Sequence, residues 1–178
     1  PAMGSTKMRL SSVELSSMAK DNFRYRTQKI LQILLVVYVG LTLVETVLLR
    51  MAGMSWFEAV CNSFSTIATG GFCTRNASIA AYGSLWIEMI VVFFMAVSGL
   101  HFGLIFATLT GKSNNIFRSE ISRYYVLSLL FGGLIVSVSL WASDMYPTFA
   151  SSMRYGFFQV VSVSSTTGFA TADLSVWG

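Results

Sequence analysis

The chain has 178 residues, of which 54% are hydrophobic and only 11% are charged. Soluble domains are about half apolar but about a quarter charged, so the shortage of charge, together with a mean hydropathy of +0.64, argues against a water-soluble fold. One His, two Cys and eight acidic residues leave little material for a metal cage, a disulfide framework or the active site of a membrane enzyme.

The segment 1–29 is polar and basic, and the formal net charge of the chain is +4. Three apolar runs follow, each close to or above the roughly 20 residues that a helix needs to cross a bilayer. They cover 30–49, 85–110 and 124–141, with one carboxylate in each of the first two and no charge in the third. We therefore predict an all-α integral membrane protein in which 1–29 is a cytoplasmic or interfacial lead-in. Its basic excess flanks the membrane and is not a nucleic-acid surface.

The basic residues also predict the orientation of the chain. Six of the twelve Lys and Arg residues lie in 1–29, and three lie in the short polar connection 111–123. Because basic residues are enriched in cytoplasmic loops, 111–123 is predicted to be cytoplasmic, and 50–84 is predicted to enter the membrane from outside.

The connection 50–84 does not resemble a simple loop. Residues 55–67 have apolar side chains at helical spacing, with Ser55 and Glu58 placed as a capping box. A helix of this length extends about 20 Å, which is too short to span. The next five residues, 68–72 (ATGGF), contain adjacent glycines that end a helix. The segment therefore predicts a re-entrant pore loop, with a pore helix at 55–67 and a filter turn at 68–72.

The same pattern recurs at an offset of 97 residues. Thr69–Thr74 (TGGFCT) lines up with Thr166–Thr171 (TTGFAT), and the apolar stretch 149–163 occupies the place of the first pore helix. One Thr-Gly-Gly-Phe is a weak motif, but two copies in equivalent places of a repeat favour a pore. The chain thus divides into a complete helix–pore-loop–helix (M1-P-M2) repeat at 30–110 and the first part of another at 124–178.

Turns of this kind suit a bare monovalent cation. An extended backbone at membrane depth, as expected at 68–72 and 166–170, can point its carbonyl oxygens at a common axis and replace the hydration shell of an ion. Glycine reaches the backbone angles that this requires and leaves no side chain in the path. Flanking threonines add hydroxyl oxygens, and the partially negative C-terminus of each pore helix faces the axis. Phe72 or Phe169 can wedge a turn against its helix.

Both turns resemble a known family. The segments STIATGGFCTRNASI (65–79) and SVSSTTGFATADLSVW (162–177) are similar to the second and third pore loops of TrkH-type bacterial potassium transporters, which belong to the Trk/Ktr/HKT superfamily. The resemblance implies four M1-P-M2 repeats around one pore, potassium as the bound ion, no organic cofactor and no enzymatic activity. By this resemblance the ion-binding filter residues are Ala68, Thr69, Gly70, Gly71, Thr166, Thr167, Gly168 and Phe169.

The resemblance also implies a cellular setting. It implies a multi-pass protein of the bacterial inner membrane that mediates potassium uptake, assembles as a homodimer and binds a cytosolic nucleotide-binding regulatory subunit of the TrkA type. The loop 118–123 is a candidate docking surface for that subunit. The chain covers fewer than two of the four repeats, and the remaining repeats are either deleted or lie outside this sequence; both alternatives stay open. Channel-like conduction and coupled symport both stay open.

Five further residues have two interpretations each. For His101, helix packing is favoured over a proton relay. Glu45 is a carboxylate inside a span, and we favour a side chain that reaches the membrane interface over a functional site. Cys61 and Cys73 are predicted to be buried free thiols rather than metal ligands. Asp173 is predicted to lie at the outer mouth, where it either concentrates cations or caps a turn.

Three other functions compete with potassium uptake. A sodium-permeable member of the same family usually carries serine in place of a filter glycine, whereas Gly71 and Gly168 are both present. A non-conducting structural membrane subunit explains the helices but not two glycine turns in register. A membrane enzyme needs clustered acidic or His residues at membrane depth. The sequence therefore favours a potassium pathway, and ion flux distinguishes it from a structural subunit.

Overall fold

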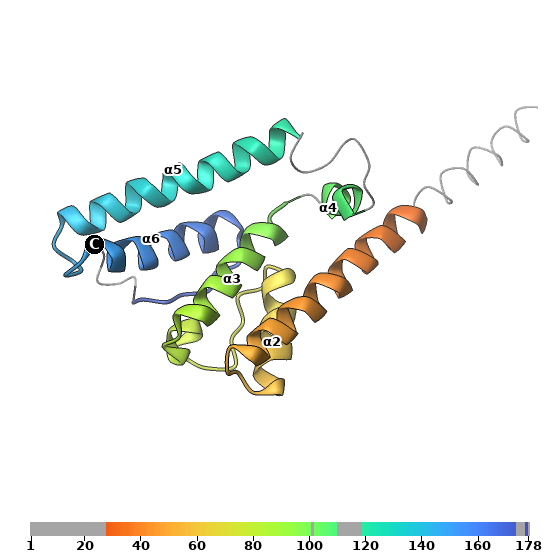
Figure 1. Cartoon of the computed structure of the whole chain (residues 1–178), viewed down its shortest axis with the longest axis horizontal. Coiled ribbons are helices and arrows are strands. Elements are labelled where there is room, and N and C mark those ends of the chain that lie inside the picture. Colours follow the sequence, from red (N-terminus) through yellow and green to blue (C-terminus); the bar gives the residue numbers. More distant parts are fainter. Residues whose placement is uncertain (1–27, 101, 110–118, 174–176, 178) are drawn as a thin grey trace, which may run out of the picture.

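The protein is described by a computed structural model that covers residues 28–100, 102–109, 119–173 and 177 (Figure 1). Within these residues all regular secondary structure is helical, as predicted. Two helices are long and apolar enough to cross a membrane: the first helix, Gln28–Met51, has 24 residues, and α5, Glu120–Ala142, has 23. Many of their large apolar side chains are exposed, as expected of a surface that faces lipid.

Two shorter helices occupy the places predicted for pore helices. They are α2, Trp56–Ile67, with 12 residues, and α6, Phe149–Ser164, with 16. At about 1.5 Å per residue, neither crosses about 30 Å of hydrocarbon. The predicted capping box is present in α2, because the Glu58 N–H donates to Ser55 Oγ (3.3 Å) and the Ser55 N–H donates to a Glu58 carboxylate oxygen (3.2 Å). The N-cap of α6 is Thr148.

The apolar run 85–110, predicted as one spanning helix, is divided in the structure. It forms α3, Leu85–Ser98, and α4, Phe102–Leu109. The two helices are bent by 102° relative to each other. The last turn of α3 tightens before the break, since the Leu100 N–H donates to the carbonyl of Val97, only three residues back (3.0 Å).

The break coincides with a close contact between α3 and α5. Gly99, the C-cap of α3, lies against Tyr125 of α5, and a Cβ atom at Gly99 would overlap the Tyr125 hydroxyl. The missing side chain therefore lets α5 pass the end of α3. Hydropathy does not show this contact, so the sequence 85–110 looks like one continuous helix. His101 and residues 110–118 lie outside the described residues, and α5 begins at Glu120, earlier than the predicted 124.

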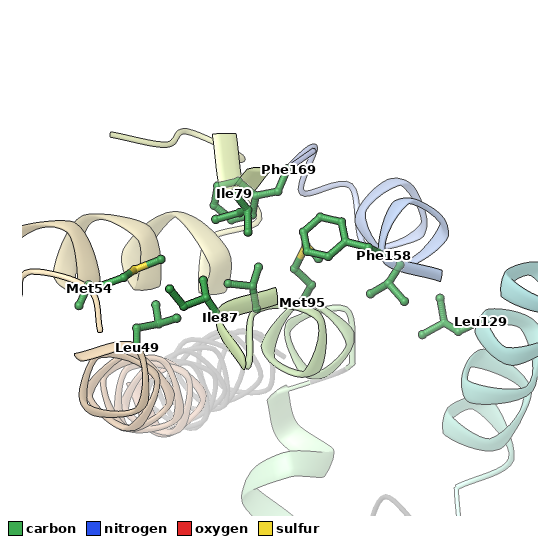
Figure 2. Packing of buried hydrophobic residues seen from close by; sticks show 11 residues of the cluster. Leu49, Met54, Ile79, Ile87, Met95, Leu129, Phe158 and Phe169 are labelled. Carbon is green, nitrogen blue, oxygen red and sulfur yellow. The ribbon is translucent and has the colours of Figure 1, made fainter. Parts of the chain in front are cut away.

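A single hydrophobic cluster joins the two repeats (Figure 2). It draws on the first helix, α2, α3, α5 and α6, on the turn that follows α6, and on η1, the 3-10 helix Ser78–Tyr82. Its buried members are Leu49, Met54, Ala59, Ile79, Ile87, Val91, Met95, Leu129, Phe158, Val161 and Phe169. Because Ile79 follows the first predicted filter turn and Phe169 belongs to the second, this shared core holds both turns in one rigid arrangement.

Candidate functional site

The end of α2 has the geometry of a Schellman cap, with Thr69 in the left-handed region. Thr69 has a φ of 52°. Its N–H donates to Thr66 O (3.0 Å), and the Gly70 N–H donates to Ser65 O (2.7 Å). Both bonds satisfy carbonyls that a helix end otherwise leaves free. The chain therefore leaves the pore helix abruptly and enters the turn 68–72 in a fixed direction.

The end of α6 repeats this geometry. Thr166 has a φ of 59°. Its N–H donates to Val163 O (3.0 Å), and the Thr167 N–H donates to Ser162 O (2.9 Å). The left-handed region costs a non-glycine residue about 1–2 kcal/mol, and a β-branched residue is a marked outlier there. Strained backbone of this kind gathers at functional sites, and here it occupies the equivalent position of both repeats.

Each turn also contains one glycine in the left-handed region. Gly71 has a φ of 69° and Gly168 a φ of 88°. A Cβ atom at Gly71 would overlap the carbonyl oxygen of Thr167, whereas nothing lies within 4 Å of a Cβ atom at Gly168. The two turns, far apart in the sequence, are therefore neighbours in space. Both predicted filter glycines occupy backbone positions that favour glycine.

The 3-10 helix η1, which follows the first turn, bonds to the last residue of the second turn. The Ala80 N–H donates to Ala170 O (3.2 Å), and the Ala170 N–H donates to Ser78 Oγ (3.2 Å). These two bonds fix the end of the second turn relative to η1. Nothing in the sequence identifies Ser78 and Ala80 as partners of Ala170, because the residues are 92 and 90 positions apart.

The two phenylalanines of the turns differ in burial. Phe169 has no exposed surface, and its carbonyl accepts a hydrogen bond from Ser162 Oγ (2.7 Å). Phe72 is 83% exposed, and the hydroxyl of Ser65, which is equivalent to Ser162, has no hydrogen-bond partner among the described residues. Of the two candidate wedges, only Phe169 packs its turn against the pore helix. Its bonded carbonyl has one lone pair fewer to offer an ion.

The structure gathers all eight predicted ion-binding residues into these two adjacent turns. Their side chains and backbone differ in accessibility: exposed are Ala68, Gly70, Thr166 and Gly168, half-buried are Thr69 and Gly71, and buried are Thr167 and Phe169. The hydroxyl of Thr167 shares a hydrogen bond with Ser165 Oγ (2.8 Å). The hydroxyl of Thr167 is therefore engaged inside its turn.

An ion pair stabilises the start of α2. Arg75 Nε donates to Glu58 Oε1 at 2.8 Å, and the guanidinium lies over the Tyr82 ring, 4.6 Å from its centroid. The hydrogen bond from Arg75, with those from Ser55, lowers the pKa of Glu58 to about 2. The same contact raises the pKa of Arg75. Because Arg75 is about half exposed, solvent screens this pair and its contribution to folding is small.

A second ion pair joins the two repeats, between α3 and α6. Arg154 donates through Nε and Nη2 to the two carboxylate oxygens of Glu88, at 2.6 and 2.7 Å. The side chains are 31% and 5% exposed, respectively, and the hydrogen bonds to Glu88 raise the pKa of Arg154. A bidentate pair of this kind fixes both distance and angle. The sequence analysis did not predict this pair, although Glu88 and Arg154 are opposite charges in two otherwise apolar segments and could have indicated it.

The chain is similar to known transport proteins. The family model TrkH, described as a cation transport protein, matches residues 1–138. The chain belongs to the TrkH family. It is 35% identical to the Trk system potassium uptake protein TrkH of Salmonella typhimurium and 34% identical to that of Escherichia coli K12. Each match covers 99% of this chain and 37% of the relative.

A solved structure of the TrkH family has the same fold. The crystal structure of the potassium transporter TrkH from Vibrio parahaemolyticus matches with a TM-score of 0.80 and 30% identity, over 86% of this chain and 33% of that chain. The predicted all-α, integral membrane fold is thereby confirmed. The chain spans 37% of the length of the TrkH relatives of Salmonella and Escherichia.

The remaining candidate residues of this TrkH-family chain lie in different environments. The prediction that Glu45 reaches the membrane interface was wrong, because its side chain has no exposed surface. Cys61 and Cys73 are partly buried free thiols, and no group of three His, Cys, Asp or Glu side chains in the described part of the chain could hold a metal ion. Asp173 is exposed, beyond the second turn, and its two interpretations stay predictions.

Proposed function

We propose that this TrkH-family chain forms part of a potassium-uptake pathway in which 68–72 and 166–170 are filter turns. The proposal depends above all on the close approach of two turns that share one geometry. Each turn leaves a pore helix through a left-handed threonine and then bends at a left-handed glycine. Gly71 of the first turn lies against the Thr167 carbonyl of the second, which is the relationship expected of neighbouring segments around a common axis.

Potassium is the ion that this chemistry suits. Removing the hydration shell of a monovalent cation requires several oxygen ligands at once, and backbone carbonyls of adjacent turns can supply them. The C-terminal ends of α2 and α6 lead directly into the turns, so their partial negative charge favours a cation. The relatives are named potassium uptake proteins. The proposed ligands are carbonyl oxygens of Ala68, Thr69, Gly70, Gly71, Thr166, Thr167 and Gly168, with Phe169 contributing least.

Two turns supply only part of a coordination shell. The relatives are longer than this chain, which spans 37% of their length, and we propose that further filter turns outside the 178 residues complete the ring. A homodimer and a cytosolic nucleotide-binding subunit of the TrkA type belong to the same proposal. The bilayer surrounds the first helix and α5, whose apolar side chains are exposed.

The proposal is tested by ion selectivity in the complete protein as its gene encodes it. The variants are Gly71→Ser and Gly168→Ser, which strain the backbone and add a group beside the axis. We expect each to lower the preference for potassium over sodium by about tenfold, equivalent to about 1.4 kcal/mol. Gly83→Ser is the matched control, because Gly83 has a φ of +56° with open space around a Cβ atom but lies outside both turns.

Each outcome has a distinct meaning. Unchanged selectivity in both filter variants, with normal folding, would exclude these turns as the filter. An equal loss in Gly83→Ser would attribute the effect to backbone strain alone. Equal permeation of sodium and potassium in the unmodified protein would favour a sodium-permeable relative, and no ion flux at all would favour a structural subunit.

A further inference from the structure

A polar interface lies between the first helix and the pore helix α2, behind the first turn. Both helices carry buried polar residues, Thr42, Glu45 and Thr46 on the first helix and Asn62, Ser63 and Thr66 on α2. A hydrogen bond of 2.6 Å between Thr46 Oγ1 and Ser63 Oγ fixes the register of the two helices. Glu45 is the only member of this polar interface that can carry a charge.

Glu45 has neither solvent nor a cation beside it. Its side chain has no exposed surface. Neither of its oxygens has a hydrogen-bond partner among the described residues. An ionised carboxylate in such a place carries a large desolvation cost, and intramembrane carboxylates are functional candidates for this reason.

The charged side chains of the surrounding elements are engaged elsewhere. On the first helix, Arg50 Nη1 donates to Met54 O (3.1 Å), and Lys29 is roughly 24 Å away along the helix axis. Glu58 of α2 pairs with Arg75, and Glu88 of α3 pairs with Arg154 of α6. Other titratable groups of these elements are Tyr38 of the first helix, whose ring packs against Phe64 of α2, and the Cys61 thiol of α2. The Tyr82 hydroxyl accepts a hydrogen bond from Asn62 Nδ2 (3.1 Å).

The hydroxyl of Thr66 decides which form of Glu45 fits. Glu45 lies next to the Thr66 side chain, but the single hydroxyl proton of Thr66 is donated to Asn62 O (2.8 Å). Thr66 Oγ1 therefore faces Glu45 with lone pairs only. A carboxylate would meet those lone pairs without a proton between them, whereas a carboxylic acid donates its O–H to Thr66 Oγ1.

Thr66 also belongs to the first turn. Its carbonyl accepts the hydrogen bond from the left-handed Thr69 (3.0 Å), the bond that directs the chain into 68–72. A proton donated by Glu45 to Thr66 Oγ1 would link Glu45 to the side chain of Thr66, whose backbone already bonds to Thr69. Thr66 is therefore the one residue through which a change at Glu45 would act on the first turn.

We propose that Glu45 is a positioning residue for the first turn and acts as an uncharged carboxylic acid that donates its proton to Thr66 Oγ1. This inference rests on the proposed role of 68–72 as a filter turn. Glu45 does not touch the ion. It holds the last turn of α2 in place, and its ionisation displaces Thr66 and thereby the carbonyls that follow.

The experiment compares Glu45→Gln with Glu45→Leu in the complete protein, reconstituted into vesicles, by potassium-against-sodium competition. The Gln side chain keeps an N–H donor for Thr66 Oγ1 without any charge, so Glu45→Gln keeps wild-type selectivity. Glu45→Leu leaves the donor site empty and lowers selectivity by about tenfold. Wild-type selectivity falls as the solution becomes strongly alkaline, and Glu45→Gln is insensitive to this change.

A second pair of variants tests the acceptor. Thr66→Ser keeps the hydroxyl and retains selectivity, whereas Thr66→Val loses it to the same extent as Glu45→Leu. The inference is overturned if Glu45→Gln is as defective as Glu45→Leu, since a charge is then required. It is also overturned if Glu45→Leu and Thr66→Val both fold and keep wild-type selectivity. Gly71→Ser separates the two proposals, because a loss of selectivity there supports the filter whatever Glu45 does.

Discussion

Gly71 lies so close to the carbonyl oxygen of Thr167 that no side-chain carbon fits between the first and the second turn. This contact is a product of tertiary structure, because η1 bonds to Ala170 and the buried Phe169 anchors the second turn in the shared core. Two requirements therefore favour glycine at position 71: the left-handed backbone, and the lack of room for a Cβ atom beside the Thr167 carbonyl. Gly168 is required only for its backbone, since a Cβ atom there would meet nothing.

Alanine substitutions separate these two requirements. Gly168→Ala adds backbone strain alone, and we expect it to lower the free energy of unfolding by about 1–2 kcal/mol. Gly71→Ala adds the same strain and an overlap with Thr167, so it should cost roughly 1–3 kcal/mol more. Thermal unfolding of the purified protein in detergent with potassium present measures the difference. Equal losses in the two variants would contradict the contact.

Two serines at equivalent positions of the repeats form a second matched pair. The Ser162 hydroxyl donates to Phe169 O, whereas the buried Ser65 hydroxyl has no partner among the described residues. Ser162→Ala should therefore lower the free energy of unfolding by about 1 kcal/mol, and Ser65→Ala should leave it nearly unchanged. A larger loss for Ser65→Ala, in the same unfolding measurement, would show that the two repeats do not differ in this way.

Local features of the repeats could be predicted from the sequence. The capping box of Ser55 and Glu58 and the length of both pore helices depend on residues within one or two helical turns of each other, so the sequence carries the whole signal. The glycine turns were predicted from the adjacent glycines that follow the first short helix and from the repeat. The left-handed threonines were not, because β-branched residues disfavour that region and only the surrounding structure holds Thr69 and Thr166 there.

Features that depend on tertiary contacts could not be predicted. Tyr125 approaches Gly99, the C-cap of α3, from another helix. Glu45 looked free to reach the membrane interface because hydropathy does not show which face of a helix packs against a pore helix. Ser78 and Ala170 pair across the two repeats, and no periodicity or motif connects them.

The ion pair between Glu88 and Arg154 should stabilise the contact between the repeats. Because Arg154 is 31% exposed, we expect Arg154→Met alone to cost roughly 2 kcal/mol, mostly through the unpaired Glu88 carboxylate. Replacing both residues, in Glu88→Leu with Arg154→Met, should cost less than the single change. A double-mutant cycle measured by unfolding gives the coupling energy. A cycle with no coupling would contradict a stabilising pair.

The predicted orientation leads to opposite labelling at two described serines. Ser84 precedes α3 and should lie on the outer side, and Ser119 precedes α5 and should lie on the cytoplasmic side. Cysteine variants at these positions, in a background with Cys61 and Cys73 replaced, are exposed to a membrane-impermeant thiol reagent in intact cells. Ser84→Cys should react and Ser119→Cys should react only after permeabilisation. Labelling of Ser119→Cys in intact cells would reverse the topology.

Acidification should weaken the start of α2 through Glu58. The pKa of Glu58 is about 2 in the folded protein, chiefly because of Arg75, against an ordinary value of 4.5. A lowered pKa means that the unfolded chain binds a proton at higher pH than the folded chain does, so stability rises with pH between these values. The contribution of Glu58 is therefore complete above pH 4.5 and is lost as the pH falls through about 2.

Unfolding temperatures across this range, compared between wild type and Glu58→Gln, isolate the contribution of Glu58 from the other acids. The difference between the two proteins should shrink as the pH falls, and Arg75→Gln should narrow the pH range over which it changes. A difference that does not vary with pH would show that Glu58 acts only as a neutral cap of the helix.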